Sequence, residues 1–311
     1  MNIRMKHFQV LKISLIALAA VLILAEIGVR LGGLVDLPTY STDNEIEYIL
    51  KPNQSGSFLN KNRWFFNNRS MGIEKNWAPA THPNILLIGN SIVMGGNPFD
   101  QPNKLGPLIQ QEIGNNYSVW PIAVGGWSDV NEAVYIERNP DVTQAANFFV
   151  WEYMFGGLGG ANPWAGDYVF PRERPIWATW YVFRRDVLPR LVSLNMNELP
   201  ATGALDKDNL KQFEAAIAKL SSATGRGTPG ILFLYPNEAQ YLAAKRGEEW
   251  LPDRPELERI AQKYGLKIVD ISRMPDWNET FYRDGTHPTV AGNKVLAHIL
   301  AASITDALAP H

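Results

Sequence analysis

The sequence predicts an α/β protein in which helices cover both faces of a parallel sheet, with a transmembrane helix before it. Two observations support this prediction. Short apolar runs alternate with amphipathic segments after residue 83, and an apolar run follows a basic N-terminus. Strands that alternate with helices pair in parallel, because each helix carries the chain back across the sheet. With 311 residues, 46% of them hydrophobic, the chain can bury a full core.

The N-terminal segment is first basic and then apolar. Arg4, Lys6 and Lys12 precede an apolar run, residues 13–25, that extends to Val29. With this far end included, the run reaches the roughly 20 residues that a spanning helix needs. Positive charges before the run place the N-terminus in the cytoplasm. We therefore predict a single-pass membrane anchor in residues 1–34, with the rest of the chain in the periplasm or the extracellular space.

A cleaved signal peptide is the alternative for this segment. Glu26 and Arg30 interrupt the far end of the apolar run, and Ala25 could precede a cleavage site. The run does not end in a clear Ala-x-Ala pattern, which favours the uncleaved anchor. Either segment would export the domain that follows.

The remainder divides into a polar, Asn-rich linker and lead-in, residues 35–80, and one catalytic domain, residues 81–311. Short apolar runs and helical spacing predict alternating elements in this domain. Gly114 is placed to end the first helix and Ser128 to begin the second. The predicted strands are 84–89, 117–124, 147–153, 230–235 and 266–271, and the predicted helices are 104–113, 128–138, 210–222, 255–264 and 289–308.

An irregular insertion rich in Gly and aromatic residues interrupts the alternation at about residues 154–205. Its second half, from about Ile176 to Leu194, has helical character. Flat aromatic faces pack well against sugar rings, although packing into the core is the alternative for these side chains. The segment also has four arginines that could meet acidic sugars or form a solvated helix face: Arg172, Arg174, Arg184 and Arg185.

Composition excludes several classes of function. The formal net charge of −2 provides no basic field for nucleic acid. Cysteine is absent, which excludes thiol nucleophiles, disulfides and Cys-ligated zinc. There is no His-Glu-x-x-His motif and no Walker loop, and Val93 stands where the Gly-x-Ser-x-Gly elbow requires its last glycine. We expect neither a metal nor a cofactor.

Ser91 follows the first predicted strand directly. Ligands gather at the carboxyl ends of the strands in open parallel sheets, so this serine is well placed for catalysis. Gly89 lets the backbone bend and present the hydroxyl, and the amides of the following helix can stabilise an oxyanion there. A helix N-cap is the alternative role for Ser91.

His287 is the histidine best placed to assist a serine. The other four lie in the basic tail, before the first strand, inside the last helix and at the last residue, whereas His287 lies in a loop that enters the last helix. A serine hydroxyl needs such a base because it is scarcely ionised at neutral pH. Asp284, three residues earlier, can reach the imidazole across a turn and fix its tautomer. The alternative for Asp284 is an ordinary turn-forming residue before Gly285.

Together these segments resemble the SGNH hydrolase superfamily of GDSL-type esterases. The resemblance rests on Gly-x-Ser-Ile at residues 89–92 and on Asp-Gly-Thr-His-Pro at residues 284–288, and it covers about residues 84–153 and 230–305. Members have a flavodoxin-like three-layer α/β/α sandwich and cleave or transfer acyl esters without a metal. The resemblance implies that Ser91 is the nucleophile, His287 the base and Asp284 the orienting acid.

The sequence departs from the family pattern near the oxyanion site. Asn90 replaces the usual Asp after the first Gly, so the hydrogen bonds of the turn are expected to differ. The resemblance implies oxyanion donors at the amides of Ser91 and Gly126, with Gly125 as the alternative to Gly126. The family's third donor, an Asn after the third strand, is missing. Loss of one such donor costs about 3–4 kcal/mol, so either another group fills its place or activity is weak.

The pair Trp151-Glu152 after the third strand is similar to sugar O-acetyltransferases of the alginate-acetylation type within the same superfamily. This similarity implies substrate-binding roles for residues at the carboxyl ends of the first three strands. These residues are Asn90, Trp127, Trp151, Glu152 and Tyr153.

We expect an exported serine acyl-ester hydrolase or O-acyltransferase that acts on O-acetyl groups of envelope or exopolysaccharide carbohydrate, with polysaccharide-modification proteins as candidate partners. Lipid or general ester hydrolysis is the alternative substrate class. Two further alternatives are a catalytically weak relative that binds polysaccharide in an export or modification complex, and an unrelated flavodoxin-like binding protein. In the last of these, Ser91 and His287 would not meet.

Overall fold

A computed structural model describes residues 2–78, 82–192, 203–225 and 229–309. Its central sheet has five parallel strands in the order β6-β5-β7-β8-β9. Counted along the chain, this order is the flavodoxin-like 2-1-3-4-5 of doubly wound folds, which confirms the predicted fold class. The strands are β5 (Asn84–Gly89), β6 (Ser118–Ala123), β7 (Ala146–Tyr153), β8 (Gly230–Leu234) and β9 (Lys267–Asp270).

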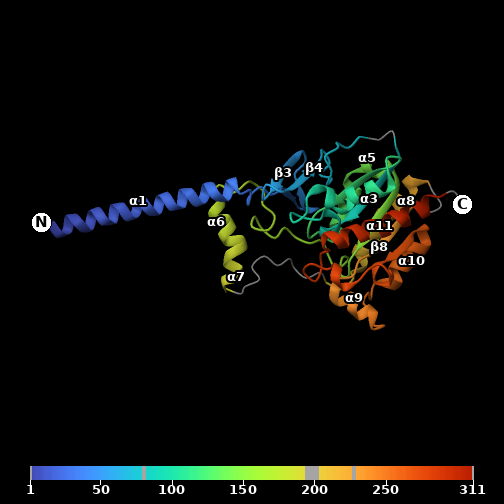
Figure 1. Cartoon of the computed structure of the whole chain (residues 1–311). Coiled ribbons are helices and arrows are strands. Elements are labelled where there is room, and N and C mark those ends of the chain that lie inside the picture. The colour runs from blue at the N-terminus through green and yellow to red at the C-terminus, as the bar shows by residue number, and fades with distance from the viewer. Residues whose placement is uncertain (1, 79–81, 193–202, 226–228, 310–311) are drawn as a thin grey trace.

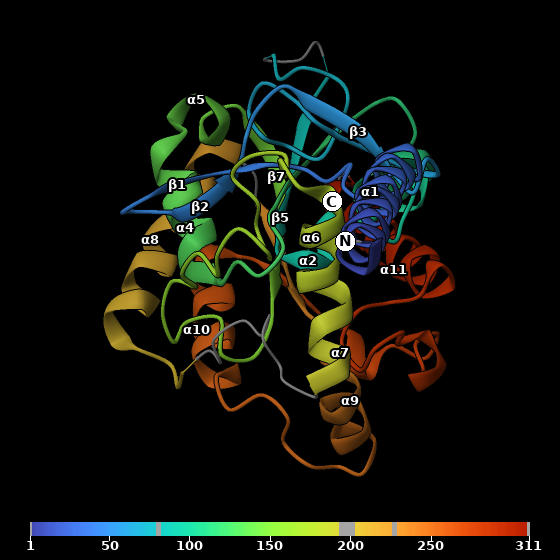
Figure 2. The ribbon, with the colours of Figure 1, turned by 90° about the vertical axis from the view of Figure 1, so that its left-hand side faces the viewer.

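Helices cover both faces of the sheet, as the alternation predicted. One face carries α3 (Leu105–Ile113) and α11 (Val290–Leu308), which pack against each other. Figure 2 shows α4, α8 and α10 on one side of β5 and β7, and α11 on the other. Every residue of β5 and β6 is buried, as expected for strands covered on both faces. The opposite face is covered by α4 (Asp129–Arg138), α8 (Lys207–Thr224) and α10 (Arg254–Tyr264) (Figure 2).

Each strand and helix expected after residue 83 is present, with ends within three residues of the prediction. Gly114 ends α3 and Ser128 caps α4, so both predicted caps are confirmed. The sequence analysis missed α9 (Glu238–Lys245), because Tyr241 is its one buried residue and leaves no apolar periodicity. The remaining short helices are α2 (Ser91–Met94) and α5 (Pro140–Thr143), with single 3₁₀ turns at Gln101–Asn103, Ile271–Arg273 and Glu279–Phe281.

Two antiparallel hairpins occupy the segment read as linker and lead-in, residues 35–80. They pair β1 (Tyr40–Asp43) with β2 (Glu47–Leu50), and β3 (Gln54–Phe58) with β4 (Asn62–Phe66). Tyr48, Leu50, Trp64 and Phe66 are buried in the main hydrophobic core. In each hairpin one strand, β1 or β3, is mostly polar and only partly buried, so the segment lacks the short apolar runs that predicted the strands of the central sheet. The described part of this segment is folded onto the α/β core, while the domain limits at residues 34 and 80 stay a prediction.

The N-terminal helix α1 (Asn2–Leu31) projects away from this body (Figure 1). Its part from His7 to Leu31 is long and apolar enough to cross a membrane, with a mean hydropathy of 2.5. The insertion becomes helical where expected, in α6 (Ala178–Val182), a π-helical turn (Phe183–Val187) and α7 (Leu188–Val192). The predicted end of this helix at Leu194, and the rest of 193–202, lie outside the described residues.

The hairpins should contribute to the stability of the catalytic core. Leu50 is fully buried, so Leu50→Ala should lower the free energy of unfolding by about 2–5 kcal/mol through lost burial and a residual cavity. Leu59→Ala, at an exposed position in the same segment, should cost about 0.5 kcal/mol or less. Urea unfolding of the detergent-solubilised full chain measures both values, and equal, small effects would mean that the segment is only a tether.

Candidate active site

Ser91 is the first residue of α2 and lies directly beyond the carboxyl end of β5, the strand between β6 and β7 in the sheet. Gly89 is required there by close packing: an added Cβ would lie 2.4 Å from Glu152 Oε2 and 2.6 Å from Val93 Cγ2. Asn90 caps the short helix, since its Oδ1 accepts a hydrogen bond of 3.1 Å from the Ile92 amide. Asn90, at the position where the family that the sequence resembles usually has Asp, thus organises the turn.

The loop that carries His287 is fixed by its neighbours. Gly285 has a φ of 78°, a left-handed conformation that favours glycine in this turn. Its carbonyl accepts the Glu238 amide of α9 at 2.8 Å, and the Tyr235 hydroxyl donates to the Thr286 carbonyl at 2.9 Å. Helix α9, which the sequence analysis missed, therefore helps to hold this loop beside β8.

The fold brings Ser91 and His287 into contact across 196 positions of sequence, with 2.8 Å between Ser91 Oγ and His287 Nε2. On the other side of the ring, Nδ1 lies 3.0 and 3.1 Å from the two carboxylate oxygens of Asp284. A carboxylate can only accept hydrogen bonds, so Nδ1 must carry the proton. Nε2 of the neutral ring is then free to accept the serine hydroxyl proton.

Asp284 is held as a carboxylate. Partial burial raises the pKa of Asp284. Hydrogen bonds from the His287 amide and ring, the charge of His287 and a hydrogen bond from Arg283 outweigh burial and lower this pKa to about 2. The His287 amide donates to Asp284 Oδ1 at 2.8 Å, so the same turn that orients the ring also stabilises the anion. Asp284 therefore stays ionised throughout the neutral range.

The loop Gly125–Trp127 faces Ser91 and is anchored from two other segments. The Tyr48 hydroxyl donates to the Gly125 carbonyl at 3.0 Å, and the Asn162 side-chain amide donates to the Gly126 carbonyl at 2.8 Å. The Gly125 amide donates to the Met94 sulfur at 3.0 Å. Because that amide is engaged, Gly126 is the better of the two predicted oxyanion donors.

Ser91 and His287 lie in a pocket of about 520 Å³. Four aromatic residues line it, which are Tyr40, Trp127, Phe155 and Phe170. Asn90, Gly125 and Gly126 also line it, so these three predicted site residues and Trp127 gather around the serine. Their convergence places the Ser91 hydroxyl, the His287 ring and the glycine loop in one cavity.

Three predicted substrate-binding residues are not in this pocket. Trp151, Glu152 and Tyr153 are at most 1% exposed, because β7 is a central strand covered on both faces. Trp151 donates to Glu132 and Tyr153 donates to Asp253, so their polar atoms have internal partners. The expectation that these residues contact a sugar directly is therefore corrected. Glu152 instead accepts the Asn90 amide at 3.1 Å and supports the turn of Ser91 from below.

A cluster of buried carboxylic acids lies beneath the pocket. Burial raises the pKa of Glu152 to about 8, against hydrogen bonds from Asn90 that lower it. Burial, with the added charge of Glu152, raises the pKa of Asp129 well above its usual range, and that of Glu132 is raised by burial and by Asp129. Asp129 also lines the pocket. The raised pKa values favour protonated acids, which can donate hydrogen bonds.

Sequence reasoning missed three residues that shape the site. Tyr48 and Asn162 anchor the glycine loop, and Asp129 lines the pocket. Asp129 immediately follows the predicted N-cap Ser128 at the carboxyl end of β6, and that position was a signal that could have identified it. The other two come from the hairpins and the insertion, where no local pattern distinguished them. Arg185, one of the four arginines considered for acidic sugars, lines the pocket as well.

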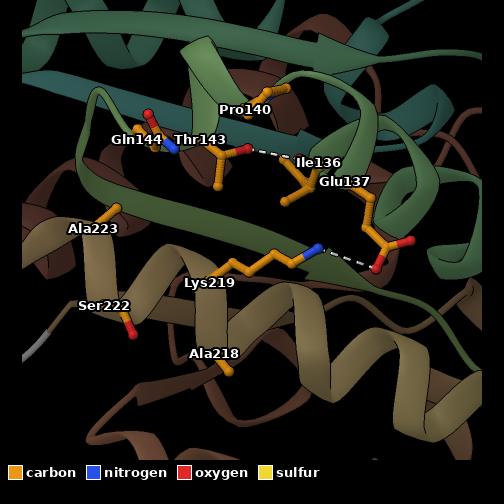
Figure 3. A pocket seen from close by; sticks show the side chains of 9 residues that line it. All are labelled: Ile136, Glu137, Pro140, Thr143, Gln144, Ala218, Lys219, Ser222 and Ala223. Carbon is orange, nitrogen blue, oxygen red and sulfur yellow. Dashed lines mark hydrogen bonds and ion pairs between the residues drawn. The ribbon is translucent and has the colours of Figure 1, made fainter.

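A second groove, of about 580 Å³, lies between α4, α5 and α8 (Figure 3). Lys219 pairs with Glu137 there at 3.3 Å, and the Thr143 hydroxyl donates to the Ile136 carbonyl at 2.7 Å. These polar groups satisfy one another, and neither Ser91 nor His287 lines this groove. The pocket at Ser91 is the candidate active site.

No family model and no curated protein matches the chain. Solved structures resemble it in backbone arrangement, at low sequence identity. The α/β hydrolase LAE5 from the metagenome of Lake Arreo, Spain, is 13% identical, with a TM-score of 0.47, over 74% of this chain and 98% of its own. Est24, a carbohydrate acetylesterase from Sinorhizobium meliloti, is 11% identical, with a TM-score of 0.40, over 72% and 99%.

A putative lipolytic protein of the G-D-S-L family from Desulfitobacterium hafniense DCB-2 is likewise similar in structure. It is 11% identical, with a TM-score of 0.41, over 71% of this chain and 99% of its own. Each of the three structures is matched over nearly its whole length, whereas more than a quarter of the present chain lies outside each match.

Glu152 should make stability depend on pH. Its folded-state pKa of about 8 lies above its ordinary value of 4.5, so between these values the folded protein binds more protons than the unfolded chain. The free energy of unfolding must therefore fall as pH rises through this window. Glu152→Gln cannot ionise, and between roughly pH 5 and roughly pH 9 we expect it to lose about 1–3 kcal/mol less than the wild type.

Urea unfolding at both pH values measures this difference. Glu279→Gln, at an exposed position, is the matched control and should keep the wild-type pH dependence. The same pH dependence in Glu152→Gln and the wild type would contradict a raised pKa at this residue.

Proposed function

We propose that this chain is an exported serine ester hydrolase or O-acyltransferase of the SGNH type. The 2.8 Å contact between Ser91 Oγ and His287 Nε2 carries this proposal, because it joins a nucleophile and a base inside a pocket. Asp284 on the far side of the ring completes the arrangement that serine acyl enzymes use. An unrelated binding protein would have no need of this contact.

The proposed reaction is a double displacement. His287 Nε2 takes the Ser91 proton as Oγ bonds to the acyl carbonyl carbon, and the resulting oxyanion accepts hydrogen bonds from the amides of Ser91 and Gly126. His287 then gives its proton to the departing alcohol oxygen as the old ester bond breaks. Water or a sugar hydroxyl next attacks the acyl-enzyme, passes its proton to His287, and receives the acyl group. His287 returns that proton to Ser91 Oγ as the bond between Oγ and the acyl carbon breaks.

Asp129 is the candidate for the missing third oxyanion donor. It lines the same pocket, its Oδ1 is buried without a hydrogen-bond partner among the described residues, and its raised pKa favours the protonated form. A protonated acid can donate to an oxyanion as an amide does. This possibility weighs against the alternative of a catalytically weak binding component.

We further propose O-acetylated carbohydrate as the substrate. Phe155 lines the pocket and is 43% exposed, so its ring is accessible to a sugar, while the buried rings of Tyr40 and Phe170 form the wall beside it. A sugar hydroxyl as acceptor would make the enzyme a transferase, and water would make it a hydrolase. Helix α1 would hold the chain in the membrane, with its N-terminus in the cytoplasm and the pocket outside.

The catalytic roles can be tested by substitution in the full-length protein in detergent. Ser91→Ala should abolish labelling by a fluorophosphonate probe, and His287→Ala should lower labelling and short-ester hydrolysis by about 10³-fold or more, because the serine loses its base. Asp284→Asn should lower kcat by about 10²–10⁴-fold by favouring the wrong tautomer.

Two substitutions control for general damage. Ser55→Ala and His298→Ala change exposed residues of the same types and should leave labelling and hydrolysis unchanged. Labelling that persists in Ser91→Ala would remove this serine as the nucleophile and with it the proposed mechanism.

Product analysis tests the substrate class. With an acetyl donor and an oligosaccharide acceptor, transfer should give acetylated oligosaccharide, while hydrolysis should give acetate at the same rate with or without acceptor. Ser91→Ala should give neither product. An enzyme that hydrolyses short esters but neither removes acetyl groups from sugars nor adds them would contradict the carbohydrate assignment and favour general ester hydrolysis.

A further inference from the structure

Among the residues that the structure describes, exposed apolar side chains outside α1 are concentrated in one region. In the described part of the chain, six of the ten large hydrophobic residues exposed outside α1 lie between residues 176 and 192. We call this segment the 176–192 arm, and it comprises α6, the π-helical turn and α7. The exposed residues are Ile176, Trp177, Trp180, Val187, Leu191 and Val192, with Ile176 at 93% and Leu191 at 69%. Such a concentration marks an interaction surface.

The arm is fixed to the last turns of α1. The Arg30 guanidinium donates to the carbonyls of Pro175 and Ile176 at 3.1 and 2.7 Å. The Glu26 carboxylate accepts the amides of Ala178 and Thr179 at 3.0 and 2.9 Å, and so caps α6, whose own N-cap residue makes no side-chain bond. The two charges that interrupt the apolar run of α1 therefore serve to attach the arm.

The arm has an inner and an outer side. Ala178 and Tyr181 are buried with Val35 and Leu37 in a small hydrophobic cluster. The Tyr181 ring also stacks on Tyr168, with 5.6 Å between ring centroids. These contacts hold one side of the arm against the body, and the exposed apolar residues remain on the side that faces away from it.

The arm lies at the end of α1 where the outer surface of a membrane would be (Figure 1). In Figure 1 the arm runs across the direction of α1, at the end of α1 that meets the body. In Figure 2, seen nearly along α1 from its N-terminal side, α6 and α7 cross the near face of the molecule. If α1 spans a bilayer, an element placed across its outer end lies along the bilayer surface.

The composition of the arm fits that position. Trp177 and Trp180 are residues of the type that gathers at membrane–water interfaces. The arm carries Arg184, Arg185 and Arg190 against a single acidic residue, Asp186, so its charge suits the phosphates of lipid headgroups. Apolar residues together with arginines are typical of helices that lie in the interface.

We infer that the 176–192 arm lies in the outer interface of the phospholipid bilayer that α1 spans, with Ile176, Trp180 and Leu191 entering the lipid. Arg185 lines the Ser91 pocket, so the arm also holds the mouth of that pocket at the bilayer surface. The inference rests on the membrane anchor of the proposed function. It places the binding site for the acyl substrate at the outer surface of the bilayer rather than in the aqueous space away from it.

Spin labels can test this placement, since the absence of cysteine lets each variant carry one thiol. Full-length Ile176→Cys and Leu191→Cys, labelled with a nitroxide, are reconstituted in vesicles of phosphatidylcholine and phosphatidylglycerol. Leu242→Cys and Val290→Cys label exposed apolar positions away from the arm as matched controls. Leu18→Cys, in the middle of α1, reports on the anchor itself. Power saturation compares collisions of each label with oxygen, which concentrates in lipid, and with a water-soluble nickel chelate.

We expect the ratio of oxygen to nickel collisions to be severalfold higher at residues 176 and 191 than at residues 242 and 290, and highest at residue 18. A high ratio at residue 18 with control-like ratios at 176 and 191 would overturn the inference and leave the anchor intact. A control-like ratio at residue 18 would show that α1 does not span the bilayer, and the placement of the arm would fall with it.

Discussion

The parallel pairing of β5 between β6 and β7 is the constraint on which the site depends. It fixes the end of β5 at the switch point of the sheet, where crossovers leave in opposite directions and open a crevice. The turn at that end is packed so closely on Glu152 that only a glycine fits at residue 89. Ser91 is thus presented by rigid backbone, and the His287 loop can reach it because β8 and α9 hold that loop at the same edge.

The hairpins and the insertion complete the pocket around Ser91. The hairpins supply Tyr48 and Tyr40, and the insertion supplies Asn162 and Phe170, around Ser91 and His287, which belong to the core. Rigid strands can hold reacting atoms in place, and small displacements of such atoms lower a reaction rate strongly. Loops and hairpins suit the walls, whose composition sets which substrate enters.

The charges around this site are arranged in two distinct ways. Asp284 is partly exposed and held ionised by its turn, whereas Glu152, Asp129 and Glu132 are buried in a low-dielectric interior that favours their protonated forms. In the proposed reaction, the Asp284 anion would stabilise the positive charge that the imidazole acquires. The raised pKa values of the buried acids favour neutral forms, which would not repel negative charge that develops on a substrate oxygen in the pocket.

The sequence alone determined the features that depend on neighbouring residues. The five buried strands follow from apolar runs, α1 follows from its composition, and the Asp284–His287 pair follows from a turn three residues long. Only the tertiary structure decided that the 35–80 segment packs into the core, that Trp151 and Glu152 are buried, and that Tyr48 and Asn162 brace the glycine loop. These features depend on contacts between segments far apart in the chain, and no local periodicity encodes which distant surface will cover a short strand or a single side chain.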